Sequence, residues 1–591
     1  MKKSLSPLFL LFYYCSLMAQ TKEIADLQKE LDHKKVLLPN GWQLSPAGRT
    51  LDLGDLPLNI AVGKSKKYLA VTNNGQSIQS IQLFNAQTEK ELHRTIIPKS
   101  WYGLKFSADE KFLYASGGND NWILKYGIVA DTLQLQDSII LGKKWPNKIS
   151  PTGIELDDAK DLLYVVTKEN NSLYIISLKN KSILFQKELA DAAYSCLLSN
   201  DKKELYISLW GDKKILVFDI LNKNFISTIN VGENPNEIML SKDGKILFAA
   251  NAGDNSVSVI DIKKRKVLET LNAALYPNSA TGSSSNGLAL SEDQKTLFVA
   301  NADNNCLAVF NIEKPGFSQS KGFIPTGWYP TNVKVIGKRI FVANGKGFTS
   351  MANPFGPNPV AKKQEVNYQG GDLKKSVEVQ YIAGLFKGKL SIIDIPNNDA
   401  LSIYSKNVYQ NTPYTKEKET LALGEKGNPV PMKLGDPSPI KHVFYIIKEN
   451  RTYDQVLGDL PQGNGDTSLV LFGRKNTPNQ HKLAEEFVLL DNFFVDGEVS
   501  ADGHNWSLAA HANDYLEKTW PTNYGGRGGS YDAEGNRNIA NPDRGFIWDY
   551  CKRAGVTYRT YGEFADDYKA NIPILENHFC PYYTSWDETV R

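Results

Sequence analysis

Seven copies of one strand–turn–strand unit occupy the middle of the chain and limit its fold more than any other feature. An apolar strand recurs at intervals of about 42 to 50 residues, with equivalent positions at Leu69, Leu113, Leu163, Leu205, Leu247, Leu297 and Ile340. Each strand follows a turn such as "SADEK" or "SKDGK" and precedes a polar link and a second strand. Apolar residues alternate with a period of two, never with the period of a helix. One such sheet cannot bury both faces, so the pattern predicts a seven-bladed β-propeller.

The repeated units resemble the YVTN-type propeller repeat, as "LFVANADNNCLAVFNI" at 297–312 illustrates. We assign residues 46–400 to the propeller and expect "GRTLDL", residues 48–53, to close the ring beside the last blade. A long insertion rich in Gly, Pro and Lys, residues 345–375, interrupts the seventh blade and is expected to reach toward the next domain. Asparagines recur at one blade position, where they either line a channel as ligands or, as we favour, bond the backbone of turns; they are Asn251, Asn301 and Asn344.

The N-terminus has the pattern of a secretory signal peptide, residues 1–19, with Lys2 and Lys3 ahead of an apolar stretch that ends at Ala19. It predicts export to the periplasm or beyond. No later apolar run is long enough for a transmembrane segment. We expect residues 20–45 to form a helical arm and residues 401–440 to form a linker.

The charge distribution limits the expected binding partners, and the cysteine positions limit the expected disulfides. The formal net charge is +3 with both signs interspersed, so nucleic acid is not expected as a partner. Cys551 with Cys580 is the one disulfide pairing that the sequence suggests, since Cys196 and Cys306 lie inside apolar strands.

The propeller repeat is absent from residues 441–591, which have a different sequence pattern. "HVFYII" at 442–447, the segment 482–497 and Val556–Tyr561 suggest strands that alternate with helices, which predicts an α/β layer with ligands at the carboxyl ends of the strands. Two polar clusters follow such strands, "ENRTYD" at 449–454 and "SADGHN" at 500–505. A serine hydroxyl at a turn that opens a helix lies near free N–H groups, where an oxyanion or phosphate binds well. The Gly-rich stretch 525–537 is either a phosphate cradle or, as we favour, a flexible loop.

The two clusters together resemble the phosphoesterase branch of the alkaline phosphatase superfamily, which includes bacterial phospholipases C and related acid phosphatases. The motifs are "YIIKENRTYDQVLGDL" and "LLDNFFVDGEVSADGHNWSLAA". The resemblance implies that Ser500 is the nucleophile, that Glu449 and Asn450 bind metal, and that Asn450 and His504 contact the phosphate, with Arg451 as a further substrate-binding candidate. Without the resemblance, Ser500 would be interpreted as a helix N-cap, and Glu449 as a strand-end partner of Arg451.

These features predict a multidomain chain in which an all-β seven-bladed propeller precedes an incomplete α/β/α alkaline-phosphatase-like domain, residues 441–591. The family's later metal-binding residues have no counterpart in "SWDETVR" or the residues before it, so we expect this domain to be truncated. The predicted function is secreted, metal-dependent hydrolysis of phosphate mono- or diesters, with a divalent ion (Zn, Ca, Mn or Mg) as cofactor. A phosphoester small molecule or phospholipid head group is the expected substrate, and the propeller could bind a protein or glycan. The alternative is an exported propeller binding protein whose phosphoesterase half is inactive.

Overall fold

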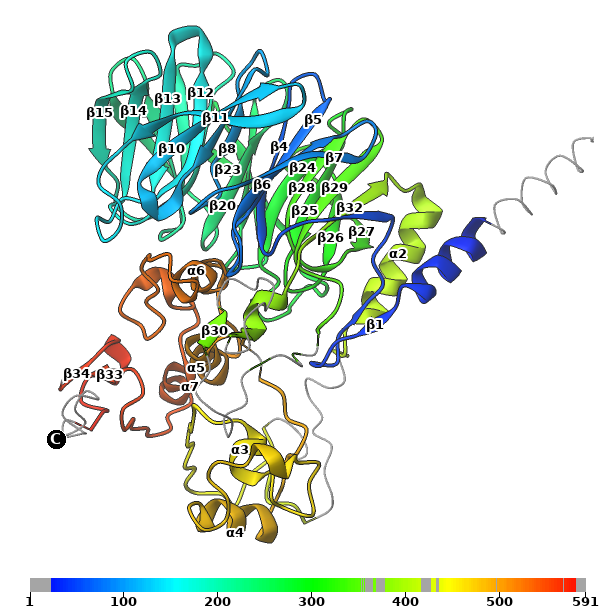
Figure 1. The fold of residues 1–591 in the computed structure, drawn as a ribbon, viewed down its shortest axis with the longest axis vertical. Helices are drawn as coiled ribbons and strands as arrows, with labels where there is room; N and C mark the ends of the chain where they lie inside the picture. The colour runs from blue at the N-terminus through cyan, green and yellow to red at the C-terminus, as the bar shows by residue number, and fades with distance from the viewer. Residues whose placement is uncertain are drawn as a thin grey trace, which may run out of the picture.

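The computed structural model describes residues 23–580 except 352, 354–355, 357–364, 368–377, 416–426, 432–434, 496 and 567. The predicted signal peptide and most of the insertion at 345–375 therefore lie outside the described residues. Seven four-stranded antiparallel sheets form the blades of a β-propeller, which confirms the seven-bladed prediction (Figure 1).

The blades follow the chain from the N-terminus. The first four are β4 (Pro57–Val62), β5 (Tyr68–Asn73), β6 (Ser80–Asn85) and β7 (Lys90–Ile96); β8 (Leu104–Phe106), β9 (Phe112–Ser116), β10 (Trp122–Val129) and β11 (Thr132–Ile140); β12 (Pro151–Asp157), β13 (Leu162–Thr167), β14 (Ser172–Ser177) and β15 (Ser182–Glu188); and β16 (Ala193–Leu198), β17 (Glu204–Leu209), β18 (Lys214–Asp219) and β19 (Asn224–Asn230). The last three are β20 (Pro235–Leu240), β21 (Ile246–Asn251), β22 (Ser256–Asp261) and β23 (Lys266–Asn272); β24 (Ser285–Leu290), β25 (Thr296–Asn301), β26 (Cys306–Asn311) and β27 (Gln319–Pro325); and β28 (Trp328–Ile336), β29 (Arg339–Gly347), β32 (Lys389–Asp394) and β3 (Arg49–Asp52).

The ring closes through strands from opposite ends of the propeller. The first strands of successive blades contact one another in the order β4, β8, β12, β16, β20, β24, β28 and back to β4. In the last blade β3, from the N-terminal side, pairs antiparallel with β32, with Arg49 opposite Ile392. The expected closure by residues 48–53 is therefore confirmed, and it leaves the propeller without an open seam.

The recurring turns owe their shape to one local interaction. In each "S-x-D" turn the Ser Oγ donates to the Asp Oδ1, and that oxygen also accepts the N–H two residues on, as in an Asx turn. The aspartates are Asp109, Asp201, Asp243 and Asp293. The residue after each Asp has a positive φ, a conformation that the tight reversal requires.

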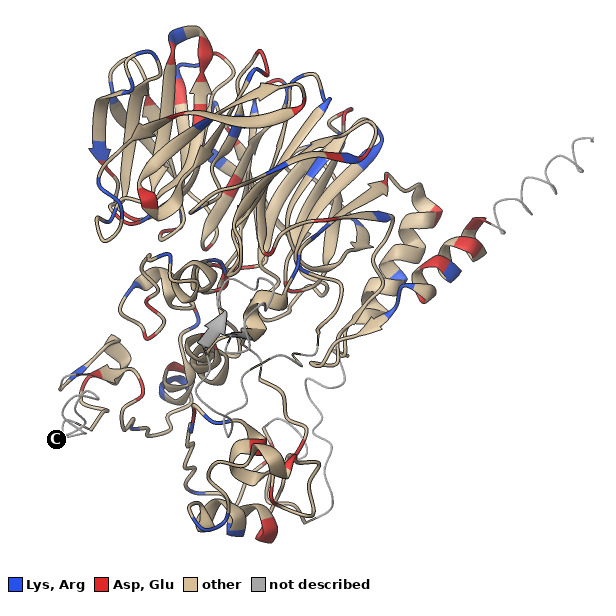
Figure 2. Ribbon diagram, viewed as in Figure 1, with Lys and Arg blue, Asp and Glu red and all other residues tan. Residues whose placement is uncertain are grey.

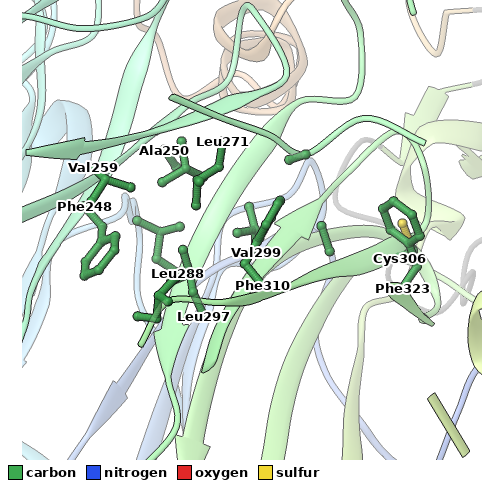
Figure 3. Close-up of a cluster of buried hydrophobic side chains, with 14 of the residues drawn as sticks. Phe248, Ala250, Val259, Leu271, Leu288, Leu297, Val299, Cys306, Phe310 and Phe323 are labelled. Carbon is green, nitrogen blue, oxygen red and sulfur yellow. The ribbon is translucent and has the colours of Figure 1, made fainter. Parts of the chain in front are cut away.

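The apolar residues of the blades pack between neighbouring sheets. In one such cluster Phe248 and Val259 of one blade pack against Leu297, Val299 and other side chains, all of the next blade (Figure 3). Full burial of a side chain of this size contributes about 1.5–3 kcal/mol, so the interfaces between blades stabilise the ring. The recurring asparagines lie inside blades: Asn251 donates to Ser256 and Asn344 to Ser391. These bonds reach serine hydroxyls on the neighbouring strand, so the asparagines have a structural role, but the favoured prediction that they bond the backbone of turns is not confirmed by these contacts.

The outer side of the propeller carries two helical segments. Residues 23–33 are helical and are followed by the paired strands β1 (Val36–Leu37) and β2 (Gln43–Leu44). Helix α2 (Asn398–Asn411) occupies the first part of the predicted linker 401–440. The linker prediction was wrong there, because Leu401, Tyr404 and Val408 form one apolar face of α2 that is buried against the blades.

The C-terminal part is largely helical. Its elements are α3 (Tyr453–Leu457), α4 (Pro478–Glu486), α5 (Ser500–Ala509), α6 (Asp514–Tyr524), α7 (Ile547–Arg553), β33 (Ala565–Asp566) and β34 (Lys569–Ala570). A further short parallel pair precedes this part, with β30 (Glu365–Asn367) inside the insertion and β31 (Glu378–Gln380) just after it. Among the described residues no helix is long and apolar enough to cross a bilayer.

The parallel sheet predicted for residues 441–591 is not formed by the described residues. Residues 442–447 and 556–559 are irregular, and the strands described after residue 441 are the two-residue pair β33 and β34. Phe444 is 89% exposed and Ile446 82%. A buried parallel strand needs neighbours on both edges and layers on both faces. The surroundings of 442–447 do not provide them, and an alkaline-phosphatase-like fold is not shown.

Helix α6 and the loop after it contact every blade at one end of the propeller. Figure 1 shows α6 lying between the propeller and helices α5 and α7. Hydrogen bonds or ion pairs join residues 514–530 to a different residue on each blade, and these residues are Gln76, Asn119, Glu169, Trp210, Asn236, Asn286 and Lys346. The Gly-rich loop is thus neither a phosphate cradle nor a free loop, because its buried Arg527 donates to the carbonyls of Gln76 and Ser77.

A buried ion pair lies at the centre of this interface. The Lys518 ammonium is 2.8 Å from Asp514 Oδ1, with both side chains almost fully buried. Trp210 Nε1 donates to Asp514 Oδ2 at 2.9 Å, and Lys518 donates to Asn286 Oδ1 at 2.7 Å. Trp210 also packs against Tyr515, with ring centroids 5.4 Å apart. The two parts of the chain therefore share one core. Figure 2 shows Lys and Arg interspersed with Asp and Glu along the ribbon of the propeller.

A second acidic group at this interface makes stability depend on pH. Burial, followed by the charge of Asp543 from the C-terminal part, raises the pKa of Glu233 to about 8, and Lys213 offsets this only in part. Between about pH 4.5 and 8 the folded chain keeps a proton that the unfolded chain has lost, so the free energy of unfolding should fall as pH rises. We expect Glu233→Gln to flatten this fall in urea unfolding measured across that range.

The control for Glu233→Gln is Glu313→Gln, which alters an exposed carboxylate paired with Lys295. Glu313 has a lowered pKa, so its replacement should leave the slope between pH 5 and 8 unchanged. An identical pH profile for Glu233→Gln and the unaltered protein would contradict the assignment.

Candidate functional site

The carboxylate at 449 and the hydroxyl at 500 meet, although 51 residues separate them along the chain. Ser500 Oγ donates to Glu449 Oε1 at 2.7 Å, and His504 Nε2 contacts Glu449 Oε2. Ser500 and His504 are four residues apart on α5, so both lie on one face of that helix. The structure thus brings together Glu449, Ser500 and His504 at a partly exposed position.

The position of Ser500 on α5 differs from that of a cap. Val499 occupies the N-cap position with an extended backbone, and Ser500 is the first helical residue. Its side chain contacts Glu449 rather than a backbone N–H of its own helix. The N-cap interpretation of Ser500 is therefore wrong, and its hydroxyl is available to a ligand beside the first turn of α5.

Glu563 completes the cluster, although no sequence motif points to it. His504 Nδ1 is 2.5 Å from Glu563 Oε1, so the imidazole bridges two carboxylates. The hydrogen bond to Glu563, acting against burial, raises the pKa of His504 to about 9. Burial alone would raise the pKa of Glu449, but hydrogen bonds from Ser500 and His504 outweigh it and lower that pKa. At neutral pH the lowered pKa of Glu449 and the raised pKa of His504 place a carboxylate beside an imidazolium.

The two residues after Glu449 differ in their relation to the site. Asn450 has a φ of +67°, a conformation that Asn tolerates better than most residues, and its side chain hydrogen-bonds Glu449 and helps to lower that pKa. Arg451 is engaged elsewhere: its guanidinium contacts the carbonyl of Asn450 and lies 5.2 Å from the ring centroid of Phe472. The structure shows no pairing of Glu449 with Arg451 among the described residues, and the substrate contact of Arg451 stays a prediction.

The cysteines do not form the pairing considered for them. Cys551 and Cys580 are free thiols, as are the buried Cys196 and Cys306. Position 551 lies on α7 and position 580 follows the bridge between Thr560 and Phe579. The C-terminal part is consequently held by packing and hydrogen bonds, with no disulfide among its described residues.

Glu449, His504 and Glu563 do not converge as one metal-ligand set. The two carboxylates hold opposite nitrogens of the His504 ring, and a protonated imidazole offers no lone pair to a metal. Carboxylate and amide oxygens, such as those of Glu449 and Asn450, are donors that hard divalent ions accept in proteins. The predicted metal pair of Glu449 and Asn450 therefore stays a prediction.

Comparisons with known proteins bear on the propeller. The family model described as "Lactonase, 7-bladed beta-propeller" matches residues 186–275, which run from within β15 to three residues past the end of β23. A search of curated proteins returned no match. Among solved structures, the chain is similar to the "Kuenenia stuttgartiensis Hydrazine Synthase", at 18% identity and a TM-score of 0.42 over 50% of this chain and 94% of that one.

Proposed function

We propose that the chain hydrolyses phosphoesters at the cluster of Glu449, Ser500, His504 and Glu563, with a divalent ion as cofactor. The observation that carries the proposal is the 2.7 Å hydrogen bond from Ser500 Oγ to the Glu449 carboxylate, beside an imidazolium. A hydroxyl becomes a nucleophile when an adjacent group takes its proton. The resemblance of both motifs to phosphoesterases supports phosphorus as the atom attacked, in a small phosphate ester or a phospholipid head group.

Each residue of the cluster has its own role in the proposed hydrolysis. Ser500 Oγ attacks phosphorus as its proton passes to Glu449, and the bond from phosphorus to the leaving oxygen breaks with its electron pair. His504, whose Nδ1–H is held by Glu563, turns its Nε2–H from Glu449 to a non-bridging phosphate oxygen in a charge-assisted hydrogen bond, and Asn450 orients Glu449. Water then attacks phosphorus, the bond to Ser500 Oγ breaks, and the hydroxyl is restored as phosphate leaves. A divalent ion held by Glu449 and Asn450 would neutralise phosphate charge and lower the pKa of the serine hydroxyl.

Two further parts of the proposal follow from the rest of the chain. The predicted signal peptide supports export, so we place the reaction in the periplasm or outside the cell.

The propeller match suggests a second hydrolytic activity, on lactones. However, α6 already engages Trp210, Asn236 and Asn286 at the face that it covers. We therefore assign the propeller a binding and supporting role.

Glu449→Gln tests the assignment of the carboxylate. The amide cannot accept the serine proton, so we expect turnover of p-nitrophenyl phosphate and its bis ester to fall about 10²- to 10⁴-fold, with a lower content of bound Zn²⁺ or Mn²⁺. Absorbance assays and elemental analysis measure the two effects. Glu485→Gln is the matched control, because it removes an exposed ion pair with Arg474 in the same part of the chain. Full turnover and full metal content in Glu449→Gln would rule out this role.

One observation favours binding without turnover as the second candidate function. The apolar segment 442–447, which a phosphoesterase would bury as a central strand, is exposed. In that case wild-type protein supplied in turn with Zn²⁺, Ca²⁺, Mn²⁺ and Mg²⁺ would hydrolyse neither ester. Measurable wild-type turnover with any of the four excludes this candidate.

A further inference from the structure

A second acidic cluster lies at the interface between the propeller and the C-terminal part. Glu498 precedes α5, Asp502 lies in the first turn of α5, and Glu517 lies on α6. Each offers an oxygen within 4.8 Å of the other two. Asp502 and Glu517 are 0% and 3% exposed. This cluster is separate from the hydrolytic site, because Asp502 is two residues from Ser500 and so points about 200° away around the helix.

The positive charge at this cluster does not balance its negative charge. Lys346 of β29 pairs with Glu498 Oε1 and, at 3.2 Å, with Glu517 Oε2. Asp303 adds a fourth carboxyl group within the electrostatic reach of Lys346. One ammonium thus faces four acidic groups, and burying uncompensated charge is strongly unfavourable. The imbalance can be removed either by protons or by a cation.

Two carboxylate oxygens of the cluster, Glu498 Oε2 and Asp502 Oδ2, have no hydrogen-bond partner among the described residues, whereas Asp502 Oδ1 accepts from the Tyr531 hydroxyl. The hydroxyl of Tyr329, whose ring lies beside Lys346, also has no partner there. Tyr329 is 1% exposed and belongs to the propeller. Its ring centroid lies 4.8 Å from Lys346 Nζ, and burial followed by the charge of Glu517 raises the pKa of its hydroxyl. A buried hydroxyl and two carboxylate oxygens left without partners are expected to have a ligand, because unpaired buried polar atoms are costly.

We infer that Glu498, Asp502 and Glu517 bind one calcium ion that joins α5 and α6 at the face of the propeller. Ca²⁺ accepts oxygen ligands at roughly 2.3–2.6 Å in flexible geometry, and oxygens within 4.8 Å of one another are no farther apart than two such bonds. Glu498 Oε2 and Asp502 Oδ2 supply free carboxylate oxygens while Lys346 keeps its contact with Glu498 Oε1. The ion would fix the start of α5 and thereby the position of Ser500, without touching the reaction.

The test titrates metal-free full-length Glu449→Gln protein with Ca²⁺ by calorimetry and follows its melting temperature. That background removes the metal ligand at the hydrolytic site, so failure here is distinct from failure of the proposed function. We expect one equivalent of Ca²⁺ to bind and to raise the melting temperature. Adding Asp502→Asn should weaken binding at least about tenfold, one carboxylate ligand being lost.

Two companion variants keep the test decisive. Glu498→Gln should weaken Ca²⁺ binding in the same way and serves if Asp502→Asn does not fold. Asp532→Asn, which alters a part-exposed acid beside Arg537, should leave binding unchanged. Absence of Ca²⁺ binding in the Glu449→Gln protein, or full affinity in both cluster variants, would overturn the inference and show that protons balance the buried charge.

Discussion

Lys518→Met should lower the free energy of unfolding by about 3–5 kcal/mol, the range measured when one partner of a buried ion pair is removed. Methionine fills a similar volume but leaves the Asp514 carboxylate in the shared core without its cation. Trp210 Nε1 and Asn236 Nδ2 would remain as its donors. Urea unfolding followed by tryptophan fluorescence measures the loss, since Trp210 and Trp520 lie on either side of this interface.

Two further variants separate the buried pair from general effects. Lys245→Met removes an exposed pair with Asp243, and we expect a change of no more than about 1 kcal/mol. Adding Asp514→Asn to Lys518→Met should recover part of the loss, because the unpaired charge disappears. A Lys518→Met protein as stable as the Lys245→Met control would show that α6 is not anchored through this pair.

Ser500→Ala should reduce turnover of a chromogenic phosphoester by at least about 10³-fold, because removing the nucleophile leaves only binding and electrostatic effects. The side chain is exposed and caps no helix, so the melting temperature should stay within about 1 °C of wild type. Initial rates at saturating ester, together with a thermal melt, separate a chemical from a structural effect. The loss should appear in kcat rather than in KM.

Ser507→Ala is the control for Ser500→Ala. Ser507 is exposed on the same helix but lies outside the cluster with Glu449. Its replacement should leave kcat unchanged. If Ser500→Ala keeps the wild-type kcat, Ser500 is not the nucleophile, whatever its contact with Glu449.

The sequence predicted the propeller because the determining signal is local and repeated. Four blades carry the same turn aspartate and all seven have alternating strands, so the repeated units predict one architecture. The meeting of Glu449 and Ser500 was also predictable, from the resemblance of both motifs to one family. Glu563 was not, because it lies in an irregular segment, 59 residues after His504, and reaches the site only through tertiary packing.

The principal errors have physical reasons too. Residues 514–530 contain Pro521 and several glycines. No local sequence pattern shows that they contact all seven blades at one end of the propeller. The strand at 442–447 was predicted from a continuous apolar run, but such a run specifies burial without specifying a partner. By contrast, α2 could have been found from Leu401, Tyr404 and Val408, whose spacing of three and four residues marks a helix face.

Trapping the covalent intermediate tests the central claim most directly. Wild-type protein with a divalent ion, mixed with a phosphoester and quenched in acid within the first turnover, should gain one phosphoryl group, and peptide mass spectrometry should locate it on Ser500. The Ser507→Ala protein should give the same adduct. Rapid turnover with Ser500 unmodified, or with the phosphoryl group on another residue, would contradict the account.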